Sequence, residues 1–158
     1  MAATTTPLIT LLANRLQSDY PHIVFRQGSD FYWSPQEKTV YYAAESEAAE
    51  SLLHELAHAL LEHDSYMRDI QLLEMERDAW TKARTVLGPK YDTPISEDAA
   101  EDALDSYRDW LHARSICPHC KATGIQQQKD IYKCVACGEK WRVNEARICA
   151  LRRYKITN

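Results

Sequence analysis

Long apolar runs are missing from this chain of 158 residues. No stretch approaches the roughly 20 apolar residues that a helix needs to cross a bilayer, and the chain start lacks the charged and apolar regions of a secretory signal. Internal repeats and low-complexity tracts are also absent. We therefore expect a cytoplasmic protein with no membrane partner, in a reducing compartment where cysteines serve metals or chemistry more often than disulfides.

The composition is that of an ordinary globular protein, with 45% hydrophobic and 27% charged residues. Wholesale disorder is therefore not expected, and the length suffices for one modest core plus a small satellite module. The charge is unevenly spread: residues 1–115 carry 10 Lys/Arg against 20 Asp/Glu, whereas residues 116–158 carry 9 against 3. This asymmetry predicts two domains, 1–115 and 116–158, and an acidic partner for the second.

Hydropathy patterning predicts an α+β fold that is mainly helical, with a small antiparallel sheet. Apolar residues at helical spacing predict four helices, the third of them stopped by Gly88-Pro89. Their approximate ranges are 7–20, 46–61, 69–87 and 96–112. Short runs of β-branched and aromatic residues predict three strands. These are expected at 23–25, 31–33 and 39–42.

The sequence His-Glu-Leu-Ala-His, at residues 54–58, lies in the second predicted helix. A helix advances about 100° per residue, so His54 and His58 share one face and can bind one zinc ion. Glu55 lies beside that face, where its carboxylate can take a proton from water without being a ligand. The surrounding leucines predict a buried helix, in which unpaired polar side chains would be costly and a metal gives them a role. We therefore predict a catalytic zinc with two histidine ligands and Glu55 as the general base.

A catalytic zinc needs a third protein ligand and an open fourth position. His63 lies about 180° round the helix from His54, so we do not expect it to be the ligand. The next helix carries Glu74 and Asp78, four residues apart on one face, and Glu76 about 200° away from Glu74. We predict Glu74 as the third ligand in preference to Glu76, with Asp78 accepting a hydrogen bond from a ligand imidazole.

Residues 53–63 and 74–80 together resemble the ImmA/IrrE family of metallopeptidases, and the resemblance covers about residues 7–88. It implies a zincin-like domain with a gluzincin-like site. The implied ligands and base are His54, His58, Glu74 and Glu55. The resemblance also implies an intracellular protein substrate, typically a helix-turn-helix repressor, and an origin in phages, mobile elements or bacterial stress loci. The family's usual Glu-x-Glu-Ala-Asp run differs here, with Arg77 in place of the small residue.

Two C-x2-C pairs, 13 residues apart, follow the last predicted helix. Each pair can direct two thiolates at one ion, and two pairs complete a closed tetrahedral site. So small a segment cannot build a sufficient apolar core, and the metal would supply much of its folding energy. We predict a zinc ribbon whose structural zinc is held by Cys117, Cys120, Cys134 and Cys137. Cys149 is left over and is expected to be a packed small residue.

The predicted ribbon and its tail are basic and carry interspersed aromatic residues, among them Tyr132, Trp141 and Tyr154. Such a surface could contact phosphates and stack on bases, so nucleic acid is one predicted partner. A solvated surface, or one that docks on the acidic first domain, is the alternative. The sequence leaves these interpretations open.

Three functions fit these motifs. The leading prediction is a zinc metallo-endopeptidase that cleaves a specific intracellular protein, a helix-turn-helix transcriptional repressor. An SprT-like protease of DNA–protein crosslinks also joins H-E-x-x-H to a zinc ribbon, but it takes a third histidine from a later segment, and here only His112 and His119 follow His63. A non-proteolytic, DNA-associated zinc-binding regulator would have no use for Glu55. Three side chains remain as candidate oxyanion donors: Tyr66, Tyr91 and His63.

Overall fold

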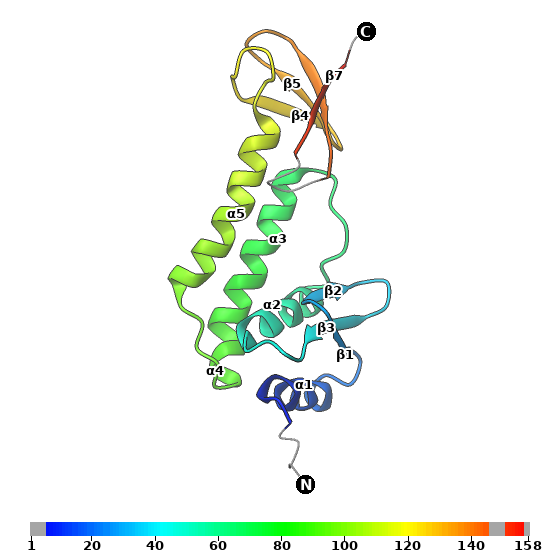
Figure 1. Cartoon of the computed structure of the whole chain (residues 1–158), viewed down its shortest axis with the longest axis vertical. Coiled ribbons are helices and arrows are strands. Elements are labelled where there is room, and N and C mark those ends of the chain that lie inside the picture. The colour runs from blue at the N-terminus through cyan, green and yellow to red at the C-terminus, as the bar shows by residue number, and fades with distance from the viewer. Residues whose placement is uncertain (1–5, 146–150, 157–158) are drawn as a thin grey trace. The chain divides into compact units, whose positions relative to one another are not determined.

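The computed structural model describes residues 6–145 and 151–156, so Cys149 lies outside the described residues. Helices and two small β-sheets make up the chain (Figure 1), which confirms the predicted α+β class. None of the helices in the described ranges combines the length and the apolar character that a bilayer crossing requires.

The chain forms two compact units, each made of two segments. The first comprises Met1–Asp64 and Met75–Ala100, and the second comprises Ser65–Glu74 and Glu101–Asn158. These units differ from the predicted domains 1–115 and 116–158. The difference arises because residues 65–74 and 101–115 group with the cysteine-bearing segment.

The first unit contains a three-stranded sheet. Its strands are β1 (Val24–Gly28), β2 (Tyr32–Ser34) and β3 (Thr39–Ala43). They lie in the order β1-β3-β2, with β1 parallel and β2 antiparallel to β3. The sheet is therefore mixed, and the prediction of an antiparallel sheet is wrong for β1. The central strand β3 carries the buried side chains of Thr39, Val40 and Tyr42, which leaves β2 as an edge strand.

Helices of the first unit pack on this sheet, with α1 against β1 and α2 against β2 and β3. The helices of the chain are α1 (Leu8–Asp19), α2 (Ala49–Leu60), α3 (Asp69–Lys82), the π-helix η1 (Ala83–Leu87), α4 (Gly88–Lys90) and α5 (Glu97–Ser115). The buried face of α2 carries Leu52, Leu53 and Leu56, none of which is exposed to solvent. This apolar face holds the H-E-x-x-H segment inside the core, as the leucine spacing predicted.

The helical backbone does not stop at Gly88-Pro89, contrary to the sequence prediction. It continues from η1 into α4, and Gly88 itself has helical angles, φ −53° and ψ −54°. Pro89, which has no N–H to donate, lies in the first turn of α4 directly after the π-helical turn of η1. Close packing explains the glycine, because a Cβ at Gly88 would lie 2.7 Å from the backbone oxygen of Thr93.

The second unit contains an antiparallel sheet of four strands in sequence order. The strands are β4 (Gly124–Gln128), β5 (Ile131–Cys134), β6 (Lys140–Val143) and β7 (Arg153–Lys155). Five buried side chains form its small core: Cys117, Tyr132, Cys134, Trp141 and Val143. A Cβ at Gly124 would lie 2.3 Å from the Trp141 ring, so the packing of this ring requires glycine there.

A buried ion pair joins the helices of this unit to its sheet. Arg114, near the end of α5, donates to the carboxylate of Asp69 at 2.6 Å and to that of Asp130 at 2.7 Å. The hydroxyl of Tyr132 on β5 donates to the same Asp69 at 2.5 Å. Arg114 and Asp69 are 2% and 1% exposed. These contacts explain why residues 65–74 and 101–115 group with the cysteine-bearing segment.

Replacing Arg114 by Met should lower the free energy of unfolding by about 3–5 kcal/mol, because a buried carboxylate at Asp69 would lose its cation. Urea unfolding followed by circular dichroism measures this loss. The matched control is Arg108→Met, since the exposed guanidinium of Arg108 pairs with Glu101 and Asp105 at the helix surface and exposed pairs contribute little. Equal losses in the two variants would contradict the importance given to the buried pair.

Candidate metal centres

Three polar side chains from two helices meet inside the first unit. His54 and His58 on α2 and Glu76 on α3 are all buried, with 6–7% of each residue exposed. Nε2 of His54 lies 3.0 Å from Oε2 of Glu76 and 3.1 Å from Nε2 of His58. Nε2 of His58 lies 3.5 Å from Oε1 of Glu76. Two ring nitrogens and a carboxylate therefore point to one spot.

This spacing fits a single metal ion. Ligand atoms placed 2.0–2.1 Å from a tetrahedral ion lie about 3.3 Å apart, and the three separations here run from 3.0 to 3.5 Å. Two imidazoles and one carboxylate also form the ligand set of catalytic zinc sites that keep a fourth position open. The group of His54, His58 and Glu76 could therefore hold a metal ion.

The charge state of Glu76 suits a cation. Burial alone would raise its pKa, but the hydrogen bonds with His54 and His58 outweigh burial and hold the pKa of Glu76 well below its usual range. Glu76 is thus a buried carboxylate, the form in which it can bind a metal. Trp80 stacks on the His54 ring at 4.1 Å between centroids and so fixes its orientation.

The carboxylate beside the histidines belongs to Glu76, and this corrects the prediction of Glu74. Glu74 is exposed on α3, whereas Glu76 shares its buried face with Ala79 and Ala83. The spacing of Glu74 and Asp78 shows that they share a face of the helix, but it does not show which face points inward. The small residues three and seven positions after Glu76 mark the inward face, and this signal could have identified Glu76.

The predicted role of Asp78, as acceptor from a ligand imidazole, is also corrected. Its carboxylate is exposed and pairs with Arg77 at 3.2 Å. Nδ1 of His58 lies instead 2.8 Å from Nδ1 of His63. The carbonyl of His63 accepts a hydrogen bond from Nε1 of Trp33 at 2.8 Å, so this histidine is held in place. His63 therefore contacts His58 at Nδ1, whereas Nε2 of His58 faces the other ligands, and His63 does not join the three converging ligands.

Glu55 lies beside this group and interacts electrostatically with both histidines. Its Oε2 accepts a 2.8 Å hydrogen bond from the backbone N–H of Trp33 on β2, which leaves Oε1 to take a proton. Burial raises the pKa of Glu55 more than the neighbouring His54 and His58 lower it. A carboxylate with a raised pKa is a better proton acceptor from water near neutral pH.

Among the candidate oxyanion donors, two have defined partners in the first unit. The hydroxyl of Tyr91 donates to Asp19 of α1 at 2.6 Å. The ring of His63 contacts His58. Tyr91 is therefore engaged with α1, and His63 is engaged with His58.

Four thiols converge in the second unit. Sγ of Cys117 lies 3.7 Å from Sγ of Cys137, and Sγ of Cys120 lies 3.5 Å from Sγ of Cys134. Thiolates placed 2.3 Å from a tetrahedral ion lie about 3.8 Å apart. The four cysteines that the sequence singled out thus form a second group that could hold a metal ion.

Each C-x2-C pair is shaped by the residue that follows it. Lys121 and Gly138 have φ of +65° and +78°, and their N–H groups bond back to the carbonyls of Cys117 and Cys134. The backbone N–H groups of the second turn also point at Sγ of Cys134, with the N–H of Cys137 at 3.5 Å. This hydrogen bonding lowers the pKa of Cys134 to about 6, although burial opposes it. The thiolate, the form that binds metals, is thereby favoured.

No family model matches the chain, and searches of curated proteins and of solved structures find no match either. The two groups of converging side chains therefore carry the functional evidence. They differ in kind: three ligands beside a carboxylate suit catalysis, whereas four thiolates suit a closed structural site.

Proposed function

We propose that the chain is a zinc-dependent metallo-endopeptidase. Its catalytic zinc is bound by His54, His58 and Glu76, and a structural zinc is bound by the four cysteines. The observation that carries this proposal is the convergence of the three ligands with Glu55 beside them. A structural site would have no use for a buried carboxylate next to an open three-ligand set.

Residues of the first unit have different roles in the proposed hydrolysis. When bound, zinc supplies a Lewis acid that polarises a carbonyl and activates water at neutral pH. Glu55 takes a proton from the attacking water on Oε1 and later passes it to the leaving amine. The N–H of Trp33 holds Oε2 and keeps the carboxylate turned for this transfer. Glu76 and the two histidines bring three ligands and one negative charge to the metal.

The position of the edge strand β2 supports the proposal that the substrate is a protein. The N–H of Trp33 points away from β3 and donates to Glu55, so the outer edge of β2 lies next to the proposed base. An extended peptide lying along this edge would place its backbone beside Glu55, which suits cleavage of an unfolded or looped segment.

The substrate that we propose is a helix-turn-helix transcriptional repressor. Its support is the resemblance of residues 53–63 and 74–80 to ImmA/IrrE peptidases. The carboxylate of Glu76 in the third ligand position argues against an SprT-like crosslink protease, which needs a third histidine. The proposed activity is therefore selective cleavage of one DNA-binding protein.

A peptide library made from a bacterial proteome tests the peptidase activity even while the natural substrate is unidentified. The zinc-loaded protein should create new peptide amino termini, detected by mass spectrometry, and 1,10-phenanthroline should abolish them. The cleavage sites would then define the sequence preference to be sought in repressors. Absence of new termini from the library and from co-expressed helix-turn-helix repressors would refute the proposal.

A further inference from the structure

One face of the β4–β7 sheet carries unbalanced positive charge. Lys133 on β5 lies directly opposite Lys140 on β6, and Arg142 lies directly opposite Tyr154 on β7. Directly paired residues share a face of an antiparallel sheet, and so do alternate residues along one strand. These four side chains therefore lie on one face, and all four are exposed.

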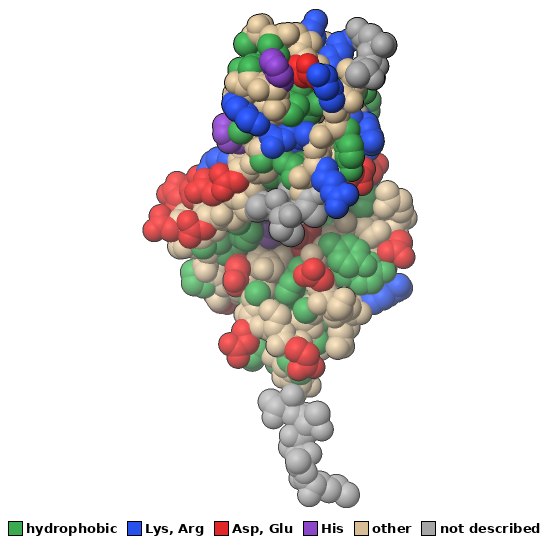
Figure 2. All heavy atoms as spheres, turned by 45° about the horizontal axis from the view of Figure 1, so that its top comes forward, with side chains coloured by type: hydrophobic (Ala, Val, Ile, Leu, Met, Phe, Trp, Pro, Cys, Tyr) green, Lys and Arg blue, Asp and Glu red, His purple; other side chains and the backbone are tan. Residues whose placement is uncertain are grey.

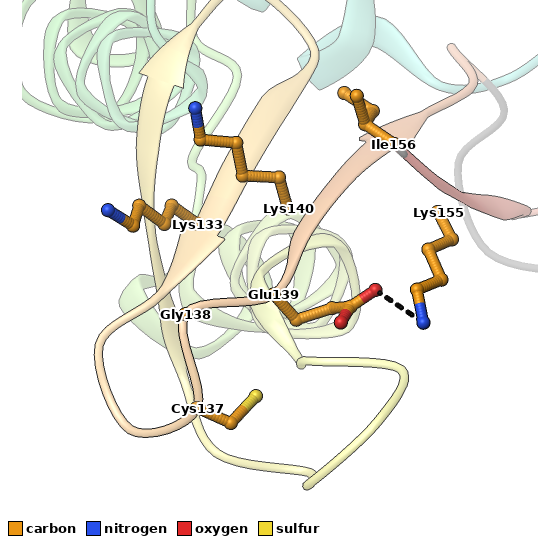
Figure 3. A pocket seen from close by; sticks show the side chains of 7 residues that line it. All are labelled: Lys133, Cys137, Gly138, Glu139, Lys140, Lys155 and Ile156. Carbon is orange, nitrogen blue, oxygen red and sulfur yellow. Dashed lines mark ion pairs between the residues drawn. The ribbon is translucent and has the colours of Figure 1, made fainter. Parts of the chain in front are cut away.

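The cations of this face lack acidic partners. Among the residues that the structure describes, neither lysine nor Arg142 forms an ion pair. Figure 3 shows Lys133 and Lys140 extending away from Glu139, whereas Lys155 on the neighbouring strand reaches it at 3.3 Å. Like charges placed directly opposite each other destabilise a sheet. An anion bound on this face would remove that cost.

The charged face is part of a broader basic region. Figure 2 shows Lys and Arg side chains gathered over the cysteine-bearing segment and few acidic ones there. Residues 116–158 carry 9 Lys/Arg against 3 Asp/Glu. Such a surface attracts polyanions over several ångströms before contact.

Exposed apolar groups accompany the cations. Tyr154 is 42% exposed, and the guanidinium of Arg142 lies 4.9 Å from its ring centroid. Ile125 on β4, opposite Lys133, is 55% exposed. A sheet face that carries cations beside an exposed aromatic ring can hold phosphates and stack a base at once.

We propose that this face of β4–β7 binds single-stranded nucleic acid. Lys133 and Lys140 contact neighbouring phosphates. Tyr154 stacks on an unpaired base with the ring face opposite the one that the Arg142 guanidinium covers. A sheet platform with an aromatic ring suits splayed bases, whereas duplex readers insert a helix or a narrow β-ribbon into a groove. This binding face shares no residue with the proposed peptidase site, so either proposal can fail without the other.

Fluorescence anisotropy tests the proposal with the full, zinc-loaded chain and a labelled oligothymidine. The oligothymidine has about 15 nucleotides, close to the upper site size of one OB fold. Lys133→Ala with Lys140→Ala should weaken binding at least about tenfold at low salt. The double variant should also flatten the dependence of log affinity on log salt by about 1.4, since each single-strand phosphate contact contributes about 0.7. Tyr154→Ala should weaken binding about tenfold, whereas Tyr154→Phe should bind nearly as well as the natural chain.

The control removes two cations of β7 that flank Tyr154 in the sequence and already have partners. Lys155 pairs with Glu139, and Arg153 donates to the backbone carbonyls of Ala113 and Ile116. Their double alanine variant should weaken binding less than about threefold. Equal losses in the two double variants would overturn the assignment of this face. Tighter binding to a duplex of the same length would overturn the choice of a single strand. The proposal as a whole would be overturned if the oligothymidine did not bind at about 10 µM protein. This concentration lies within the range of dissociation constants for non-specific binding.

Discussion

Glu76→Ala should lose one of two bound zinc ions per chain, whereas Glu74→Ala should keep both. Glu76 provides one of three converging ligand atoms, while Glu74 is exposed two positions away on the same helix. Loss of a partner that only supports a ligand already lowers metal affinity about 10–100-fold. Loss of the ligand itself should therefore lower the affinity of this site by more than about 100-fold.

The measurement is zinc per chain by mass spectrometry after dialysis against a weak chelator. The cysteine group lies in the second unit, so the zinc that it binds should be retained in both variants. Its retention shows that this unit is folded. Loss of a zinc from Glu74→Ala with full retention in Glu76→Ala would restore the sequence prediction of Glu74 as ligand.

Glu55→Gln should keep both zinc ions and lower the rate of peptide cleavage about 10²–10⁴-fold, the range expected for loss of a general base. The amide has the shape of the carboxylate, and its oxygen can still accept the N–H of Trp33. The substitution therefore removes proton transfer while preserving the local contacts. Cleavage rates under substrate saturation, measured beside zinc content, separate a chemical defect from a binding defect.

The matched control for this substitution is Glu62→Gln, which changes an exposed carboxylate just after the same helix. Its cleavage rate should equal that of the natural chain. If Glu55→Gln cleaved as fast as Glu62→Gln, Glu55 would not be the base and the proposed mechanism would be wrong.

The sequence predicts those parts of the candidate sites that depend on local geometry. His54 and His58 are one helical turn apart, so any helix through them directs both rings to one side. The turn after each C-x2-C pair is equally local, because two thiols and a residue with positive φ follow one another within five positions. In both cases the ligand spacing along the chain is also the spacing in space.

The parts that the sequence missed depend on packing between distant segments. Glu74 and Glu76 differ only in which face of α3 packs against α2, and charge spacing along α3 does not determine that. The strand order β1-β3-β2 likewise depends on which strand is most deeply buried, because that strand takes the central position next to β1. The grouping of residues 65–74 with the cysteine-bearing segment depends on Asp69, whose partner Arg114 lies 45 positions later in the chain.

Anomalous diffraction at the zinc edge from crystals of the zinc-loaded protein tests the central claim most directly. We predict two peaks per chain, one among the four cysteine sulfurs and one about 2.0–2.2 Å from Nε2 of His54, Nε2 of His58 and a carboxylate oxygen of Glu76. A single peak at the cysteines, with His54, His58 and Glu76 bonded only to one another, would contradict the proposed catalytic centre.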